Sequence, residues 1–285
     1  MCAVLIDLHC HSLCSDGTDP PRFVAERAAA GKVRLFCLTD HDTLAGHPET
    51  TGVHAGMQVL RGMELSCGER GRAVHLLLLG VEDGPGLARL QEQITLLQSR
   101  RRDRIGEICA RFLRWNIHLD PAAILAETRG GTPGRPHVAA ALVKAGVVRT
   151  VREAFDRFLK DGGPADVPGP RLSVEEGAAL GRAAGAKVSL AHPHTVGHPE
   201  VVRALLQRAR EAGLGGIEAY YGPYGSRDKA AWLELSRELE LVVTGGSDYH
   251  GKSTPEITGP GVELPDELGA RLWSWLGISE SPADA

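Results

Sequence analysis

The stretch Asp7-Leu8-His9-Cys10-His11-Ser12-Leu13-Cys14-Ser15-Asp16-Gly17 decides the fold of this chain. It directly follows the apolar run Ala3-Val4-Leu5-Ile6, which is typical of a buried strand. Side chains two positions apart lie on the same face of a strand, so Asp7, His9 and His11 point to one side. A buried strand has little other reason to carry a carboxylate and two imidazoles on one face, because unpaired polar groups are costly there. The pattern predicts one wall of a metal site at the end of a strand.

The bulk properties are those of an ordinary globular protein. The chain has 285 residues and a formal net charge of −4 with His counted as neutral. This length allows one large domain or a domain with an insertion, and the charge does not indicate a broadly basic nucleic-acid surface. No apolar run approaches the ~20 residues of a membrane span, and the start lacks the pattern of a secretory signal. We therefore expect a cytoplasmic protein without a membrane partner, and no obligate protein partner is evident.

Strand and helix patterns alternate in the first and last parts of the chain. Apolar strands are expected at 33–39, 57–65, 73–80, 187–191, 216–220 and 241–244, with helices at 20–32, 174–184, 200–212 and 226–239. Near-continuous apolar strands between helices indicate a parallel sheet that is buried on both faces. Polar residues at several strand ends favour a barrel whose active site lies at the carboxyl ends of the strands. The predicted fold class is therefore α/β.

The middle of the chain breaks this alternation. Helical patterns follow one another at 87–115, 121–128, 136–145 and 151–160, and we find no convincing strand there. Because Gly- and Pro-rich segments flank the block, we expect a barrel domain made of 1–83 and 168–285 and a helical insertion, 84–167, that caps the barrel mouth. The first of these helices carries Arg100, Arg101, Arg102 and Arg104. We expect these arginines to form a solvated helix face; contact with an RNA backbone is the less favoured alternative.

Polar residues recur where the other predicted strands end. The segments concerned are Thr39-Asp40-His41-Asp42, Gly62-Met63-Glu64, His75, Ala191-His192-Pro193-His194 and Gly246-Ser247-Asp248-Tyr249-His250-Gly251. Residues far apart in the chain converge at a barrel mouth when they lie at strand ends. Their nitrogen and oxygen donors suit Mn, Fe(II) or Zn, and the absence of a C-x-x-C pair argues against a structural zinc finger.

These motifs resemble the PHP (polymerase and histidinol phosphatase) superfamily of metal-dependent phosphoesterases. The motifs D-x-H-x-H, T-D-H-D, A-H-P and G-S-D-x-H occur in that order, and the resemblance covers nearly the full chain. It is strongest to the small stand-alone group that contains nucleoside 3′,5′-bisphosphate phosphatases and a related 5′-to-3′ exoribonuclease. Gly134-Arg135-Pro136-His137-Val138-Ala139 resembles the R-x-H element of that group. The implied fold is a distorted (β/α)7 barrel, the PHP fold, with a helical insertion domain.

The resemblance also implies a cluster of two to three divalent metal ions, Mn, Fe or Zn. The first metal would be held by His9, His11, Glu64 and Asp248; the second by Glu64, His75 and His192, with Glu64 bridging; and the third by Asp16, His41 and His250. Some relatives have His at the position of Asp16, which leaves the strength and selectivity of the third site open. We expect Asp7 and Asp40 to orient imidazoles rather than to bind metal, as carboxylates often do around metal-bound His.

The implied chemistry is hydrolysis of a phosphate monoester by a metal-bound hydroxide, with Glu64 and Asp248 in the catalytic centre. Divalent ions neutralise the phosphoryl oxygens and lower the pKa of a bound water toward ~7. Arg135 and His137 are the candidate phosphate contacts, since a guanidinium fork suits phosphate oxygens. His194 is a candidate for a further substrate contact or for protonating the leaving oxygen.

Two positions depart from the family pattern. The residue after A-H-P is commonly Gly in relatives and is His194 here, whereas a His is expected near the position of Tyr224. We therefore hypothesise that a phosphate-binding His has moved to position 194, and we place Tyr224 among the candidate substrate contacts.

The preferred prediction is removal of the 3′-phosphate from a nucleoside 3′,5′-bisphosphate, so the expected partner is a nucleotide or a short RNA. One alternative is a 5′-to-3′ exoribonuclease that acts on short 5′-phosphorylated RNA. A second is a histidinol phosphate phosphatase, whose pattern fits less well. A third is a non-catalytic nucleotide-binding module, against which the intact set of candidate metal ligands argues.

Overall fold

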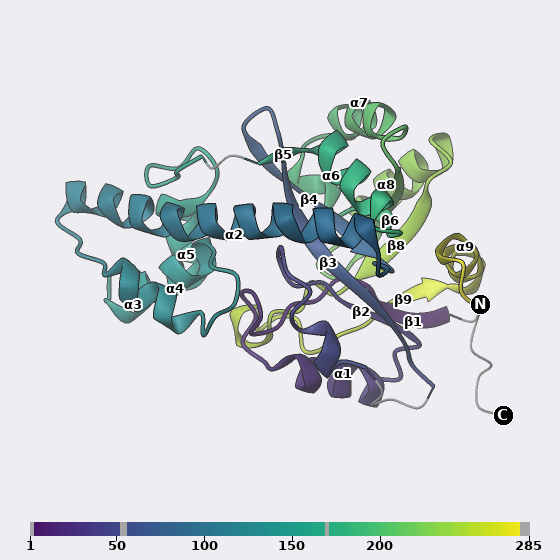
Figure 1. The fold of residues 1–285 in the computed structure, drawn as a ribbon, viewed down its shortest axis with the longest axis horizontal. Coiled ribbons are helices and arrows are strands. Elements are labelled where there is room, and N and C mark those ends of the chain that lie inside the picture. Colours follow the sequence, from purple (N-terminus) through teal and green to yellow (C-terminus); the bar gives the residue numbers. More distant parts are fainter. Residues whose placement is uncertain (1–2, 52–55, 169–170, 280–285) are drawn as a thin grey trace.

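The strands form one sheet that curls into a nearly closed barrel (Figure 1). The structure is a computed structural model, and it describes residues 3–51, 56–168 and 171–279. The order along the sheet is β8-β7-β6-β4-β3-β2-β1-β9, with β5 paired to β3. The strands are β1 (Ala3–Asp7), β2 (Leu35–Leu38), β3 (Gln58–Glu69), β4 (Arg72–Leu79), β5 (Leu172–Ser173), β6 (Lys187–Leu190), β7 (Leu214–Tyr221), β8 (Val242–Gly246) and β9 (Val262–Pro265). The predicted barrel-like α/β fold is confirmed.

Helices surround the barrel, and a helical arm extends from one side of it (Figure 1). Around the barrel lie α1 (Pro21–Ala30), α6 (Val174–Ala183), α7 (Pro199–Ala209), α8 (Ser226–Glu238) and α9 (Asp266–Leu276). The arm contains most of α2 (Pro85–Phe112), together with α3 (Pro121–Glu127), α4 (Arg135–Lys144), α5 (Val151–Ala154) and the π-helical turn η3 (Phe155–Leu159). Short 3₁₀ turns are η1 (His47–Glu49), η2 (Leu113–Trp115), η4 (Pro193–Thr195) and η5 (Gly251–Ser253). In the described part of the chain, no helix is long and apolar enough to cross a membrane.

Two of the described strands run antiparallel to their neighbours: β9, which pairs with β1, and β4, where a parallel strand was expected. The pairs β1–β2, β2–β3, β6–β7 and β7–β8 are parallel, but β4 is antiparallel to both β3 and β6. The expectation of an all-parallel sheet was therefore wrong. The reason is the two-residue turn Arg70-Gly71, where both residues have positive φ (48° and 81°). Such a turn makes a tight hairpin, whereas a parallel connection needs a dozen or more residues.

The barrel seam lies between β1 and β8 and is closed by individual backbone hydrogen bonds. The N–H of Leu8 donates to the carbonyl of Gly245 (3.1 Å). The buried carboxylate of Asp7 joins the two sides, because it accepts hydrogen bonds from Ser247 Oγ (2.6 Å) and from the N–H of Gly261 (2.6 Å). Burial raises the pKa of Asp7 to about 6. Asp7 touches the backbone N–H of His9 rather than its ring, so the structure gives it a role in closing the barrel and not the expected role of orienting an imidazole.

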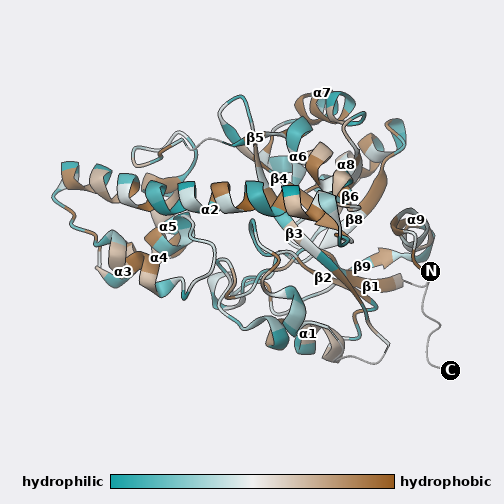
Figure 2. Cartoon of the chain, in the orientation of Figure 1, coloured by the Kyte–Doolittle hydropathy of each residue, from teal (hydrophilic) through white to brown (hydrophobic). Residues whose placement is uncertain are grey.

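The described residues form three hydrophobic cores, and α2 contributes to two of them; the third packs α1 against β2 through Val24, Ala28 and Phe36. The first half of α2 packs on the barrel core through Leu87, Leu90, Ile94 and Leu97. Its second half packs on α3, α4 and η3 in a separate core that contains Ile105, Ile108, Phe112, Ile124, Leu142 and Phe158. Figure 2 shows hydrophobic residues along β1, β2 and β8 and a mixed hydropathy on the surrounding helices. The segment 84–168 contains helices and no strand, as expected, while the division of the chain at 84 and 167 stays a prediction.

The contact between α2 and α6 generates a prediction about stability. Gly86 lies so close to α6 that a Cβ added there would be 1.8 Å from the carbonyl oxygen of Ala183. We expect Gly86→Ala to lower the free energy of unfolding in urea by about 1–3 kcal/mol, because the two helices must separate to make room.

Gly106→Ala is the matched control in the same helix. A Cβ at Gly106 meets no atom within 4 Å. Replacing an unhindered helical Gly by Ala should raise the free energy of unfolding by up to about 1 kcal/mol. If the two variants shift the urea midpoint in the same direction, the close approach of α2 and α6 is contradicted.

Candidate metal centre

The structure brings the predicted metal ligands together at the rim where the strands of the barrel end. They come from the segment after β1, the segments after β2, β6 and β8, and the strands β3 and β4 themselves; the residues are His9, His11, Asp16, His41, Glu64, His75, His192, Asp248 and His250. The antiparallel direction of β4 matters here. His75 lies near the start of β4 and pairs with Ser66 of β3, which puts its imidazole on the same rim as Glu64.

The carboxylate of Glu64 lies at the centre of this cluster, and only 1% of it is exposed. One oxygen, Oε2, faces three imidazole nitrogens, those of His9 (3.4 Å), His11 (3.2 Å) and His41 (3.0 Å). The other oxygen, Oε1, faces those of His75 (2.7 Å) and His192 (2.9 Å). The two oxygens of one carboxylate thus face two separate sets of imidazoles. A carboxylate that bridges two metal ions needs this arrangement.

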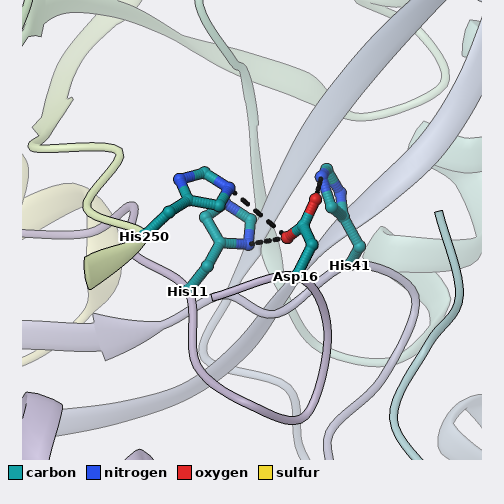
Figure 3. Close-up of side chains that lie close together, drawn as sticks. All are labelled: His11, Asp16, His41 and His250. Carbon is teal, nitrogen blue, oxygen red and sulfur yellow. Dashed lines mark ion pairs between the residues drawn. The ribbon is translucent and has the colours of Figure 1, made fainter. Parts of the chain in front are cut away.

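Three groups of side chains each have ligand atoms within 4.8 Å of one another: His11, Asp16, His41 and His250; His9, His11 and Glu64; and His41, Glu64 and His75. Figure 3 shows the first group, in which Asp16 faces all three imidazoles and the rings of His11 and His250 are stacked with centroids 4.1 Å apart. Asp248 Oδ1 adds to the second group, at 3.4 Å from His9 Nε2. The third group includes His41, while His192, which the resemblance implies for this site, lies 2.9 Å from the same Glu64 oxygen as His75.

Several polar atoms of the cluster fit a metal centre because they lack any other partner. The buried atoms His9 Nε2, His11 Nε2, Asp16 Oδ1 and His41 Nδ1 make no hydrogen bond within the described residues. Leaving a buried polar atom unpaired costs about 1–3 kcal/mol, so several of them at one point require an explanation. Nitrogen and oxygen donors that converge in this way suit a divalent cation such as Mn, Fe or Zn.

The electrostatics of the cluster also favour cations. Burial by itself would raise the pKa of the Glu64 carboxyl, but the fields of His41, His75 and His9 outweigh burial and hold that pKa well below its usual range. Burial likewise opposes protonation of His11, yet the adjacent carboxylates of Asp248 and Glu64 raise the pKa of His11 to about 10. The carboxylates therefore remain ionised and draw positive charge into the cluster.

Further side chains set the orientation of the imidazoles. Glu218, fully buried in β7, lies 2.9 Å from His9 Nδ1 and accepts a hydrogen bond from the backbone N–H of His192 (2.6 Å). With Nδ1 of His9 engaged by Glu218, its Nε2 is left facing the cluster, which is the usual way in which carboxylates fix metal-binding imidazoles. Similarly, His250 Nδ1 donates to the backbone carbonyl of Asp248 (2.8 Å). Sequence reasoning assigned no role to Glu218, although a carboxylate within the apolar run Ile217-Glu218-Ala219 was a usable signal.

Asp40 stabilises the loop that carries the motif rather than an imidazole. Its carboxylate accepts hydrogen bonds from Ser12 N (2.7 Å), Ser12 Oγ (2.6 Å) and Ser15 Oγ (2.6 Å). The structure therefore corrects the expectation that Asp40 orients a His directly. Ser15 Oγ in turn lies 3.4 Å from His11 Nδ1, so any effect of Asp40 on that ring passes through Ser15.

The backbone at the rim is strained. Asp42, His192 and Asp248 have positive φ angles of 49°, 24° and 55°, which side chains other than Gly rarely adopt. Each costs roughly 1–3 kcal/mol and persists only where the surrounding structure enforces it, and such residues gather at functional sites. Two of the three are predicted metal ligands, and the third anchors an arginine of the neighbouring pocket.

A pocket of about 230 Å³ adjoins the cluster and is lined by arginines. Asp16, His41 and His75 form its inner wall, and the basic lining consists of Arg100, Arg101, Arg104, Arg135 and Arg171. The expectation of a solvated arginine face on α2 was therefore wrong for Arg101 and Arg104, which are half-buried in this pocket, and right for the exposed Arg102.

Acidic and backbone groups hold these arginines in place. Arg101 donates from Nε to Asp42 Oδ2 (2.7 Å) and from Nη2 to Ser66 Oγ (2.6 Å). Arg135 donates from Nη1 to Asp161 Oδ1 (2.6 Å). Burial, followed by the positive charges of Arg135 and Arg171, lowers the pKa of Arg104 to about 10. Five guanidinium groups thus line one pocket together with three carboxylate partners, Asp42, Asp161 and Asp166, and this surplus of arginines suits an anion.

The remaining predicted substrate contacts have different surroundings. His137 does not line the arginine pocket; its Nδ1 accepts the backbone N–H of Gly134 (3.1 Å), so it caps the start of α4. His194 is exposed beside His192, with ring centroids 6.2 Å apart. Tyr224 is only 9% exposed, and its hydroxyl is hydrogen-bonded to His194.

Comparisons with known proteins agree with this geometry. The PHP domain family profile matches residues 7–160. The phosphoribosyl 1,2-cyclic phosphate 1,2-diphosphodiesterase of Eggerthella lenta is 34% identical, over 86% of this chain and 94% of that protein. A 5′-3′ exoribonuclease of Haemophilus influenzae is 30% identical, over 86% and 89% of the two chains. The 3′,5′-nucleoside bisphosphate phosphatase of Chromobacterium violaceum is 31% identical, over 86% and 87%.

Solved structures show the same fold. An amidohydrolase from Chromobacterium violaceum, solved with bound sulfate, superposes with a TM-score of 0.84 at 29% identity and covers 93% of this chain and 96% of its own. A protein from Bifidobacterium adolescentis named as a metal-dependent phosphoesterase superposes with a TM-score of 0.81 at 30% identity, over 96% of each chain. With a profile match over more than half of its length and full-length relatives at this level of identity, the chain belongs to the PHP domain family.

Proposed function

We propose that this protein is a metal-dependent phosphoesterase that removes the 3′-phosphate from a nucleoside 3′,5′-bisphosphate. The observation that carries the proposal is the junction of the two sites: Asp16, His41 and His75 belong to the metal cluster and also line the arginine pocket. A substrate with one phosphate at the metals therefore has room for a second anion among the arginines. Guanidinium groups bind phosphate oxygens in a fixed fork, which makes a second phosphate the best occupant.

The names of the relatives support a substrate with two phosphates. Nucleoside 3′,5′-bisphosphate and phosphoribosyl 1,2-cyclic phosphate both denote a ribose that carries two phosphate groups. Histidinol phosphate carries a single phosphate and an ammonium group, which a pocket lined by arginines would repel. The intact cluster argues against a module that only binds nucleotides.

For the metals, we propose two to three ions of Mn, Fe or Zn, with Glu64 as the bridging ligand. His9, His11 and Asp248 would complete the first site. His75 and His192 would complete the second site, with His41 close by. Asp16, His41 and His250 would form the third site. Ions bound there would neutralise phosphoryl oxygens and lower the pKa of a water, which is the Lewis-acid contribution to this class of reaction.

The chain itself contributes orientation and charge. Glu218 fixes the ring of His9, Arg104 and Arg135 hold the phosphate that is not cleaved, and His194 offers a hydrogen bond to the reacting phosphate from the rim. We propose that 84–167 acts as the cap, because α2 and α4 supply most of the arginines. His137 supports the start of α4, next to Arg135.

A 5′-to-3′ exoribonuclease is the second candidate, and one observation favours it. Arg100 is exposed at the edge of the pocket, and five arginines line a pocket where one phosphate needs fewer. A longer phosphate backbone would use the additional charge.

A substrate panel tests the function. The Mn²⁺-loaded protein should release inorganic phosphate fastest from a nucleoside 3′,5′-bisphosphate when it is compared with histidinol phosphate and a 5′-phosphorylated oligoribonucleotide. Stepwise release of 5′-nucleotides from the oligoribonucleotide at a higher kcat/KM would favour the second candidate. Failure to turn over any of the three would contradict the phosphoesterase proposal.

Glu64→Gln tests the bridging carboxylate. The amide keeps the shape of the side chain but loses the negative charge and one metal-binding oxygen. We expect kcat to fall about 10³-fold or more, because metal-ion catalysis supplies several kcal/mol and each decade of rate is 1.36 kcal/mol. The metal content measured by elemental analysis should fall in parallel.

The control for this variant is Glu69→Gln at the end of the same strand. Glu69 pairs with Arg208 (2.9 Å) on the outside of the barrel, far from the imidazoles. The Glu69→Gln variant should retain wild-type turnover and metal content. Both variants should keep the circular-dichroism spectrum of the wild type. Retention of more than about a tenth of the wild-type kcat by Glu64→Gln would exclude the bridging role, given the size of the effect expected above.

Arg104→Gln tests the pocket for the second phosphate. Hydrogen bonds to charged groups are worth about 1.5–3 kcal/mol, so kcat/KM for a nucleoside 3′,5′-bisphosphate should fall roughly 10- to 100-fold. For a nucleoside 3′-monophosphate, which lacks the second phosphate, kcat/KM should change little.

Arg102→Gln is the matched control, because Arg102 is exposed on the same helix. It should leave both kcat/KM values within about twofold of wild type, as surface substitutions usually do. Equal losses on the two substrates in Arg104→Gln would show that the arginine acts on the fold and not on the second phosphate.

A further inference from the structure

The hydroxyl of Tyr224 is bonded twice to a single residue, His194. It lies 2.8 Å from His194 Nδ1 and 3.2 Å from the backbone nitrogen of His194. The two residues come from different segments: His194 from η4, after β6, and Tyr224 from the loop after β7. Tyr224 is nearly buried, whereas the side chain of His194 is exposed.

The two contacts bear differently on where the protons lie. A backbone N–H can only donate, so the Tyr224 oxygen accepts from the backbone of His194. Nδ1 of the ring lies 2.8 Å from the same hydroxyl and either accepts its hydrogen or donates to its oxygen, depending on the tautomer. When the hydroxyl donates, Nδ1 accepts and Nε2 of the neutral imidazole carries the proton. The hydroxyl can therefore hold one tautomer of His194.

His194 stands beside the metal centre. Its ring centroid is 6.2 Å from that of His192 and 5.5 Å from that of Tyr221, whose hydroxyl donates to Asp248 Oδ2 (2.7 Å). Because Nδ1 faces Tyr224, Nε2 occupies the opposite side of the ring, away from Tyr224. An exposed ring nitrogen of fixed orientation therefore lies beside the cluster.

We propose that Tyr224 is a positioning residue that holds His194 as the Nε2–H tautomer, so that Nε2 donates a hydrogen bond to an oxygen of the phosphate being cleaved. The proposal rests on the proposed function, since it supposes a phosphate at the metal centre. It also changes the expectation for Tyr224, whose hydroxyl is engaged by His194 instead of by the substrate. Without this hydroxyl, the ring can rotate and divide between two tautomers, and the donor is correctly placed for only part of the time.

A double-mutant cycle on kcat tests the coupling. Tyr224→Phe should lower kcat on a nucleoside 3′,5′-bisphosphate about 3- to 10-fold, the effect of one net hydrogen bond, with unchanged metal content. His194→Ala should lower kcat at least as much. In the His194→Ala background, Tyr224→Phe should lower kcat no further, because the hydroxyl acts on the reaction through the ring, while its bond to the backbone of residue 194 bears on stability and not on kcat.

Tyr220→Phe, near the end of β7 just before the loop that carries Tyr224, is the control. The Tyr220 ring packs against Lys229, outside the cluster, and loss of its hydroxyl should leave kcat within about twofold of wild type. Equal losses from Tyr224→Phe in the wild-type and His194→Ala backgrounds would overturn the proposal, since a merely structural tyrosine behaves in that way. Wild-type kcat in Tyr224→Phe would overturn it as well.

A spectroscopic measurement separates this proposal from the proposed function. Two-bond ¹H–¹⁵N correlation spectra of the zinc-loaded protein at about pH 8, where free imidazole is neutral, report which ring nitrogen is protonated. The His194 signals are those that vanish in His194→Ala. We expect a protonated Nε2 and an unprotonated Nδ1 in the wild type, and averaged shifts in Tyr224→Phe.

The opposite tautomer in the wild type would exclude the proposal, whatever the substrate is. If the expected tautomer is seen but no phosphate ester is turned over, the proposed function fails while the arrangement of His194 and Tyr224 stands. If esters are turned over and the cycle is additive, only the positioning role fails.

Discussion

The structure depends on one buried carboxylate, that of Glu64, which lies within 3.4 Å of imidazoles from five different positions in the chain. An ionised group with 1% exposure is stable only if positive charge or hydrogen bonds surround it, so the barrel has to close around this residue. That requirement explains two features of the fold. The seam between β1 and β8 is joined through Asp7, which keeps the segments just after these strands, with His9 and Asp248, next to each other. The β3–β4 hairpin brings His75 back to the same rim.

The candidate metal ligands could be predicted from sequence because each follows a local rule. Alternation along a strand puts His9 and His11 on one face, and the carboxyl ends of parallel strands meet at one rim. Features that depend on contacts between distant segments could not be predicted. Arg101 looked solvated because its partner, Asp42, lies 59 positions away and is brought to it only by folding. The direction of β4 was missed although the signal, Arg70-Gly71, was local, because the strand itself is as apolar as its parallel neighbours.

Helix α2 is long enough to connect the barrel and the helical arm mechanically. The helix runs without interruption for 28 residues, with its first half in the barrel core and its second half in the core of the arm. Arg101 and Arg104 lie between these halves, and Asp42, Ser66 and Asp166 hold them from the barrel side and the arm side. A continuous helix fixes the distance between its residues, so the arginine pocket cannot shift far from the metal cluster without breaking one of the two cores.

The two sites carry opposite fields over a short distance, and this opposition bears on selectivity. The carboxylates of Asp16, Glu64 and Asp248 attract cations, while the arginines that line the adjoining pocket attract anions. A phosphate ester with a single phosphate satisfies the metal side only and makes no use of the arginine pocket. A molecule with a second phosphate at the right distance satisfies both sides, whereas one with an ammonium group in that place is repelled. Selectivity of this kind arises from an unfavourable interaction with the wrong substrate as much as from contacts with the right one.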